Sequence, residues 1–502
     1  MSLAQKAVSG AAWNIVASLG ARILGVVATL IVTRFIAPGE YGQVIGAAIL
    51  VQTCVAISQL GLLQYLAVKR DAGPDVIFHI TFYTSLVCSV ALAVALVTSD
   101  RIGPFFGVNE LGKYLPWLCV AGMMDRLSSI PERILYRNLR FRFVALTRAA
   151  GELAFSIGAM LLAGLGKGGM AIIVATLLRS GLRSVIFVAA VDARTWLRPY
   201  ALRWSTTRAI FAFGLPLSVS NIAGVLSTRW DNLITSHYFG PGIMGAYNLA
   251  YGLSEMPVTQ VAEQVGDVLL PSFAQMAPDE RRKTLGRSMA LLGIIVFPLA
   301  VGLAAVSDTL ARAFFDAKWA NVGPMLALLS VLSITRPVIY IVVSYLQASS
   351  RVFAVSTIEV TKMFLLFAMM IAAAPYGIMA MCTAVGAAFL FHALAGLWVV
   401  TRDGLSLSAT LLRLARPLLS TLPMAAAVLA VRWGLAAIGL RSAQLGLIIE
   451  IVVGAVVYVP SALLIAGDTA RDLLSLIRNR KQAPSPDDLP PGEVPPAEIP
   501  TA

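Results

Sequence analysis

The sequence predicts an all-α polytopic membrane protein with about fourteen transmembrane helices, arranged as two pseudo-twofold lobes of six helices plus two extra C-terminal helices. Three observations favour this class. Of the 502 residues, 58% are hydrophobic and only 13% are charged, with a mean hydropathy of +0.80. Apolar segments of about 18–25 residues follow one another along the chain, and each is long enough to cross roughly 30 Å of hydrocarbon. Turn motifs also recur in the same order in the two halves of the chain.

The net charge of +13 indicates membrane topology and not nucleic-acid binding. Lysines and arginines gather in alternate loops in a ratio of about 4:1, which is the positive-inside pattern and places both termini in the cytoplasm. The region that contains Arg126 and Arg133 is interpreted as one of these basic cytoplasmic loops. The opposite set of loops holds only six basic residues, namely Arg101, Lys113, Lys167, Arg312, Lys318 and Arg441.

No cofactor or metal site is expected. The four cysteines are isolated within predicted spans, without metal-type spacing, so we interpret them as small apolar packing residues. The three histidines are scattered along the chain at His79, His237 and His392.

An internal repeat is predicted from turn motifs. "TRFIAPGEYGQV" (33–44) aligns with "SHYFGPGIMGAY" (236–247), and "TSDRIGPFFG" (98–107) resembles "VSDTLARAFFD" (306–316). Both shifts are about 203–209 residues, and about six spans separate the members of each pair, which indicates a parallel repeat with its axis along the membrane normal. The alternative is chance recurrence of Pro-Gly turns. The predicted units are an N-lobe (1–208, spans 1–6), a C-lobe (209–400, spans 7–12), spans 13 and 14 (401–466) and a disordered Pro-rich cytoplasmic tail (467–502).

Charged residues inside the predicted spans are the candidates for substrate contact. Such a side chain costs roughly 2.5–3.5 kcal/mol at the bilayer centre, so it is expected to face the interior of the bundle. Arginines facing a central cavity from both lobes suit a diphosphate, because a guanidinium pairs phosphate oxygens bidentately and keeps its charge. The candidates are Arg22, Arg34, Arg229, Asp231, Arg336, Glu152, Arg179 and Glu255.

Structural ion pairing is the alternative reading for these charges. Asp231 is poorly placed to pair with Arg229, because residues two apart point to different faces of a helix. Either Asp231 bonds another helix, which is favoured, or Arg229 awaits a ligand. Glu359 and Lys362 lie three residues apart, and a structural pair is favoured there. For Glu152, substrate contact, protonation and a bond to a neighbouring helix stay open.

Three segments resemble a known family. "ARILGVVATLIVTRFIAPGEYG" (21–42), "STRWDNLITSHYFGPGIMGAYNLAYGLSEMPVTQVAEQVGDVLLPSFAQM" (227–276) and "RILYRNLRFRFVAL" (133–146) are similar to polysaccharide flippases of the multidrug/oligosaccharidyl-lipid/polysaccharide exporter superfamily. The resemblance covers roughly residues 5–465 and is closest to the exopolysaccharide branch.

The resemblance implies a Wzx-like flippase, a transporter and not an enzyme. It would move an undecaprenyl-diphosphate-linked oligosaccharide from the cytoplasmic to the periplasmic leaflet of a bacterial inner membrane. Implied partners are this lipid, the surrounding membrane lipids and other polysaccharide-assembly proteins. Related lipid II flippases carry an arginine in the first span that Arg22 matches, which implies a diphosphate contact. Their second basic residue is absent here, since Val26 to Thr29 are uncharged.

Alternating access of the two lobes is the expected mechanism. Coupling to proton or sodium flow, or to the membrane potential, is compatible with the acidic residues Asp231, Glu152 and Glu255. A cation-coupled multidrug exporter of the same fold is the main alternative, and the arginines argue against it. A membrane polysaccharide polymerase or ligase is a further alternative, which the short external loops and dispersed histidines disfavour.

Overall fold

The computed structural model describes residues 20, 24–25, 27–68, 72–439 and 442–482, and all regular secondary structure in this part of the chain is helical. This confirms the all-α class. Ten helices within the described residues are long and apolar enough to cross a membrane, or up to eleven if a bent pair within the longest helix forms one span. The number fourteen stays a prediction.

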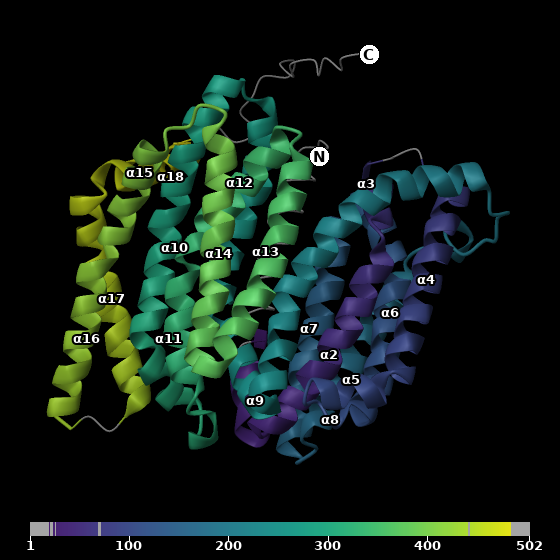
Figure 1. The fold of residues 1–502 in the computed structure, drawn as a ribbon, viewed down its shortest axis with the longest axis horizontal. Coiled ribbons are helices and arrows are strands. Elements are labelled where there is room, and N and C mark those ends of the chain that lie inside the picture. Colours follow the sequence, from purple (N-terminus) through teal and green to yellow (C-terminus); the bar gives the residue numbers. More distant parts are fainter. Residues whose placement is uncertain (1–19, 21–23, 26, 69–71, 440–441, 483–502) are drawn as a thin grey trace.

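The N-terminal helices form one of two groups that stand side by side (Figure 1). A helical stretch at 27–35 precedes them. The group comprises α2 (Pro38–Gln59), α3 (Leu62–Val68), α4 (Pro74–Val97), α5 (Ser99–Phe105), α6 (Leu111–Arg137), α7 (Phe141–Gly164) and α8 (Gly169–Ala189). Glu40 of α2 fastens the start of α8, because its carboxylate accepts hydrogen bonds from the Gly169 amide at 2.6 Å and from the Tyr114 hydroxyl at 3.4 Å.

The second group follows α9 (Trp204–Gln275), which passes from one group to the other (Figure 1). It contains the second part of α9 with α10 (Pro278–Phe314), α11 (Val322–Leu332), α12 (Arg336–Ala348), α13 (Val352–Ala373) and α14 (Ile378–Thr401). At its outer edge lie α15 (Leu407–Leu419), α16 (Thr421–Ala437), α17 (Ala443–Ile465) and α18 (Gly467–Gln482) (Figure 1). Short 3-10 turns occur at Ala193–Thr195, Ala317–Trp319, Ser333–Thr335 and Ala374–Tyr376.

The order of helices supports the proposed repeat. Pro38 opens α2, and Gly240 interrupts α9 with φ 80° and ψ 170°, so that Pro241 opens a new helix in the same way. Helices α4, α7 and α8 have counterparts in α10, α13 and α14, each roughly 200 residues further along the chain, as a parallel repeat requires. We keep the terms N-lobe for α2–α8 and C-lobe for the second part of α9 with α10–α14.

The prediction that Arg126 and Arg133 lie in a loop was wrong. Arg126 and Arg133 lie within α6, and Arg126 is only 2% exposed. The reason is that α6 carries several charged residues and two internal prolines, Pro116 and Pro131, so its second half lacks the hydropathy of a span although it is helical.

The two lobes meet where Pro38 and Pro241 open their helices. A Cβ added to Gly42 would lie 1.9 Å from the Pro241 carbonyl oxygen, and one added to Gly245 would lie 2.4 Å from that of Pro38. Next to this crossing, the Trp319 indole N–H donates to the Thr33 carbonyl at 2.8 Å. We call this region the closed end, because backbones of both lobes touch there without side chains between them. In Figure 1 the two groups separate towards the opposite end.

Gly42→Ala is expected to open the closed end. The added methyl group has no space against the Pro241 backbone, and overpacking of this kind costs about 1–3 kcal/mol, which shifts a two-state equilibrium about ten- to hundredfold. The measurement is the alkylation rate of Ser236→Cys in a cysteine-free background, since Ser236 is 1% exposed at this end. Gly39→Ala is the matched control, because nothing lies within 4 Å of its added Cβ. Equal alkylation rates in the two variants would contradict the prediction.

Helix α9 does not divide between the lobes at residue 208, where the sequence placed the boundary. Its first part, Trp204–Leu215, bends by 45° from the part that begins at Ser218. This first part packs on the N-lobe: Ile210 is fully buried against α3 and α4, and Thr207 bonds the Tyr83 hydroxyl at 3.0 Å. The described structure therefore places the start of the seventh span on the N-lobe.

The prediction of a disordered tail from residue 467 is also wrong for its first part. Residues Gly467–Gln482 form α18, and Asp472 pairs with Arg287 of α10 at 2.8 Å. Residues 483–502, the Pro-rich part of the tail, lie outside the described residues.

Candidate functional site

A cavity of about 340 Å³ lies between α2, α6, α8 and α9. Most of its wall is apolar, with residues such as Ile45, Ala48 and Val55 of α2. Its polar groups are two glutamines of α2, an aspartate of α6, a threonine and an arginine of α8 and an arginine of α9: Gln52, Gln59, Asp125, Thr176, Arg179 and Arg229. An apolar pocket with a few convergent polar groups is the usual form of a ligand site.

Three successive residues of α9 point in three directions. Arg229 lines the cavity and is exposed. The Trp230 indole N–H donates to Thr53 of α2 at 3.0 Å. Asp231 is fully buried on the other side of the helix. This separation follows from the helical turn of about 100° per residue.

Asp231 does not face the cavity, which corrects the expectation of a substrate contact there. Its carboxylate accepts a hydrogen bond from the Tyr247 hydroxyl at 2.7 Å and two from Asn232 at 2.9 Å. Tyr247 lies beyond the Gly240 break, in the next span. Asp231 therefore holds two neighbouring helices together, as its poor placement for pairing with Arg229 indicated.

Arg229 has no salt-bridge partner within the described part of the chain. The charge of Arg229 acts electrostatically on Tyr41 and Asp231, but neither residue forms an ion pair with it. A guanidinium that lines a cavity without an acidic partner keeps its donors for a ligand.

Arg179 is the second arginine of the cavity, and unlike Arg229 it has an acidic partner. Its guanidinium lies 3.7 Å from the Glu152 carboxylate of α7 and 5.1 Å from the centre of the Phe155 ring. Its Nε is buried without a hydrogen-bond partner among the described residues. Glu152 thus bonds a neighbouring helix, one of the readings left open from the sequence.

A further group of charges lies along the same N-lobe wall. Glu132 of α6 accepts a hydrogen bond from Arg148 of α7 at 2.6 Å and lies 3.8 Å from Arg183 of α8. Arg148 and Arg183 both belong to the side of the N-lobe that faces away from the closed end, because they sit near the start of α7 and the end of α8. Arginine side chains therefore continue from the cavity towards the open side.

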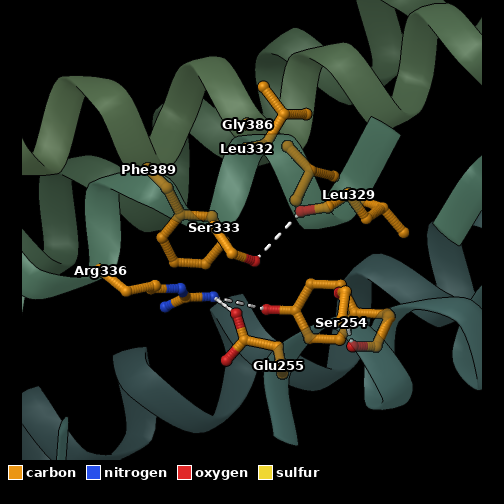
Figure 2. Close-up of a pocket in the computed structure, with 10 residues that line it drawn as sticks. Ser254, Glu255, Leu329, Leu332, Ser333, Arg336, Gly386 and Phe389 are labelled. Atoms are coloured by element: carbon orange, nitrogen blue, oxygen red, sulfur yellow. Dashed lines mark hydrogen bonds and ion pairs between the residues drawn. The ribbon is translucent and has the colours of Figure 1, made fainter. Parts of the chain in front are cut away.

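Arg336 and Glu255 lie in a separate pocket inside the C-lobe, of only about 10 Å³. They form an ion pair with each other, and Arg336 also donates to the Tyr251 hydroxyl at 3.1 Å. Figure 2 shows the Arg336 side chain pointing at Glu255, with Phe389 beside it, and the guanidinium lies 3.7 Å from the centre of the Phe389 ring. A pair that neutralises itself in so small a space leaves no room for a head group, so neither residue is placed as a substrate contact.

The remaining two candidates are Arg22 and Arg34. Arg22 lies outside the described residues. Arg34 is exposed and sits at the closed end, where its backbone carbonyl accepts a hydrogen bond from Lys318 at 2.8 Å. Of the seven candidates that lie within the described residues, Arg229 and Arg179 are the two that line the cavity.

Sequence reasoning missed the polar groups that the cavity adds to these arginines. Gln52 and Gln59 lie seven residues apart on α2, the spacing of one helix face, and this signal was available from the sequence. Asp125 was not named as a candidate from the sequence. Its carboxylate accepts a hydrogen bond from Ser180 of α8 at 3.0 Å, which fixes its position in the wall.

No group of three or more metal-binding side chains occurs among the residues that the structure describes. The four cysteines are all buried and unpaired.

Comparison with protein families gives a match over more than half of the chain. Residues 31–324 match the family described as polysaccharide biosynthesis protein. The chain belongs to this family.

Curated relatives carry names from the assembly of bacterial surface polysaccharides. The chain is 25% identical over 374 residues to the lipopolysaccharide biosynthesis protein WzxC of Escherichia coli K12, covering 73% of this chain and 74% of WzxC. It is 26% identical to the succinoglycan biosynthesis transport protein ExoT of Rhizobium meliloti, covering 64% of each chain. It is 22% identical to the teichuronic acid biosynthesis protein TuaB of Bacillus subtilis, covering 67% of this chain and 70% of TuaB.

Solved structures share the fold. The lipid II flippase MurJ in an inward closed conformation superposes with a TM-score of 0.73 at 16% identity, covering 90% of this chain and 98% of MurJ. An inward-facing multidrug resistance MATE transporter of the MOP superfamily gives a TM-score of 0.58 at 15% identity, covering 77% of this chain and 94% of that one. The chain therefore shares the fold of these two structures.

Proposed function

We propose that this polysaccharide biosynthesis protein is a flippase that moves an undecaprenyl-diphosphate-linked oligosaccharide across the bacterial inner membrane, for the synthesis of an exopolysaccharide, a capsule or an O-antigen. The observation that carries the proposal is the unneutralised Arg229 in a cavity that also contains Arg179. The names of WzxC and ExoT, and the fold shared with MurJ, support the same class of cargo.

The head group would bind with its diphosphate at the two arginines. Guanidinium forks bind phosphate oxygens through short charge-assisted hydrogen bonds, and they gain strength in a cavity with apolar walls. Gln52, Gln59 and Asp125 offer amide and carboxylate groups to the hydroxyls of the adjoining sugars. The polyprenyl chain would stay in the surrounding lipid, where it keeps its contacts with hydrocarbon.

The topology expected from the basic loops gives the direction of transport. With both termini in the cytoplasm, the turns that contain Pro38 and Pro241 lie on the periplasmic side. The closed end is then periplasmic. Because the two lobes separate towards the other end (Figure 1), the cavity would receive cargo from the cytoplasmic leaflet. Opening of the Gly42–Pro241 crossing would release cargo to the periplasm in an alternating-access cycle.

The alternatives fit the cavity less well. A multidrug exporter with cationic substrates needs acidic or aromatic groups in the cavity, whereas arginines outnumber acids there. A coupling ion at Asp231, Glu152 or Glu255 would have to displace the bonds that each of these carboxylates makes. A polymerase or ligase would need a cluster of catalytic groups that the lining of this cavity does not contain.

A flipping assay tests the proposal. The purified protein is reconstituted into liposomes with a fluorescent undecaprenyl-diphosphate oligosaccharide, and the fraction open to a membrane-impermeant glycan oxidant is followed with time. Protein-dependent transfer of the inner-leaflet lipid is the expected result. Absence of transfer with several glycans, together with cation-driven efflux of dyes, would favour the exporter instead.

A further inference from the structure

A cluster of three titratable side chains lies inside the C-lobe, outside the cavity. Glu359 and Lys362 come from α13, and His392 comes from α14. Lys362 is 3% exposed and His392 is 6% exposed. The Lys362 ammonium pairs with Oε1 of Glu359, as the spacing of the two residues predicted.

His392 is incompletely bonded. Its Nδ1 is buried and has no hydrogen-bond partner among the described residues. It faces Oε2 of Glu359 at 3.7 Å, which is too long for a hydrogen bond and short enough for an ion pair. A buried ring nitrogen without a partner costs free energy, and a proton on this nitrogen would supply the missing bond to the carboxylate.

The cluster is connected to the helix that carries Arg229. Oε1 of Glu359 also accepts a hydrogen bond from the Ser227 hydroxyl of α9 at 3.3 Å. Two turns earlier on α9 and one turn earlier on α13, Ser220 bonds Ser356. Ser227 precedes Arg229 by two residues, so a movement of Glu359 is passed directly to the cavity wall.

The charges around the cluster allow the Glu359 carboxylate to pair strongly with only one cation at a time. Burial opposes a positive charge on His392 most strongly, Lys362 and Arg336 of α12 oppose it as well, and Glu359 favours it. Glu255 of α9 is already paired with Arg336, and α11 contributes no charged residue. Lys362 and a protonated His392 therefore compete for the same carboxylate.

We propose that Glu359 and His392 form a proton-binding site that controls the position of α9. A proton from water binds Nδ1 of His392, and the imidazolium then donates to Oε2 of Glu359. The carboxylate moves towards α14 and weakens its bond to Ser227, which frees α9 to move. The proton leaves when the ring returns to its neutral form in the other state of the cycle. This role rests on the proposed flippase function, whereas proton binding itself does not.

The first test is the pH profile of flipping in the liposome assay. The wild-type rate is expected to rise by up to about tenfold for each unit that the pH falls between 8 and 6, because the occupancy of a single proton site changes by up to tenfold per pH unit. His392→Gln should reduce this change to less than about twofold, since glutamine keeps a polar side chain but does not titrate near neutral pH. Lys362→Met should shift the profile to higher pH, because Glu359 then lacks its competing cation. His237→Gln, which removes an exposed histidine outside the cluster, should keep the wild-type profile.

The second test observes the proton directly and needs no transport. The chain has 3 histidines, so the ¹⁵N imidazole signals that disappear in His392→Gln identify this residue. The signals of His392 should report protonation at higher pH in Lys362→Met than in the wild type, and the added variant Glu359→Gln should reverse this shift. A wild-type pH profile of flipping in His392→Gln would overturn the proton site. So would His392 imidazole signals that stay unchanged from pH 5 to pH 8 in both the wild type and Lys362→Met. A wild type that flips no lipid at any pH would instead overturn the proposed function, and the imidazole signals would still decide on the site.

Discussion

Arg229→Ala is expected to lower the rate of flipping about ten- to hundredfold. A charge-assisted hydrogen bond in a cavity contributes about 1.5–3 kcal/mol, and each 1.4 kcal/mol corresponds to a factor of ten. Arg229→Lys should retain part of the rate, because an ammonium keeps the charge and loses the bidentate geometry. The rate is measured in the liposome assay at equal amounts of reconstituted protein.

The matched control for Arg229 is Arg312→Ala. Arg312 is exposed and pairs with Asp308 one helical turn away, so its loss should leave both the fold and the rate unchanged. An Arg229→Ala protein that flips lipid at the wild-type rate would show that the cavity arginine has no role in cargo binding.

Glu255→Gln is expected to destabilise the C-lobe by about 3–5 kcal/mol. Arg336 is only 7% exposed, and removal of its partner leaves a buried charge without compensation. The double variant Glu255→Gln/Arg336→Met should recover most of this loss, because it removes both charges from the interior. Thermal unfolding of the purified proteins, followed by intrinsic fluorescence, measures the effect.

The exposed pair of Arg312 and Asp308 again provides the comparison. Asp308→Asn should change the free energy of unfolding by less than about 1 kcal/mol, as is usual for surface pairs. Asp308→Asn is expected to unfold at the wild-type temperature. If Glu255→Gln also unfolds at that temperature, then the buried pair does not stabilise the C-lobe.

Much of the architecture was predictable because lipid limits a chain to few solutions. Long apolar segments must form helices in a membrane, and this constraint holds whatever their neighbours are. The Pro-Gly turns at Pro38 and Pro241 indicated equivalent helix starts for a different reason, because proline is favoured in the first turn of a helix. The assignment of Arg126 to a basic loop was wrong, because this residue is buried inside α6 and not exposed to water.

The candidate site was predictable only in part. The sequence indicated that Arg229 would face an interior space, and the surrounding apolar residues were sufficient for that inference. It gave no means of knowing that Arg336 meets Glu255, because the partners come from different spans and the match depends on tertiary packing. The same limit applies to Asp125, whose position in the cavity wall is set by Ser180 of another helix.

The most direct test of the central claim is protection of the cavity by its cargo. Thr176 lines the cavity and is half-buried, so Thr176→Cys in a background without Cys54, Cys88, Cys119 and Cys382 provides a single thiol at the site. Its alkylation by a charged reagent is measured with and without undecaprenyl-diphosphate oligosaccharide, and Ser408→Cys, exposed on α15, serves as the control. The lipid should slow alkylation at position 176 alone, and less so when Arg229 is replaced by alanine. Unchanged alkylation at a lipid concentration that supports flipping would contradict the binding of the head group in this cavity.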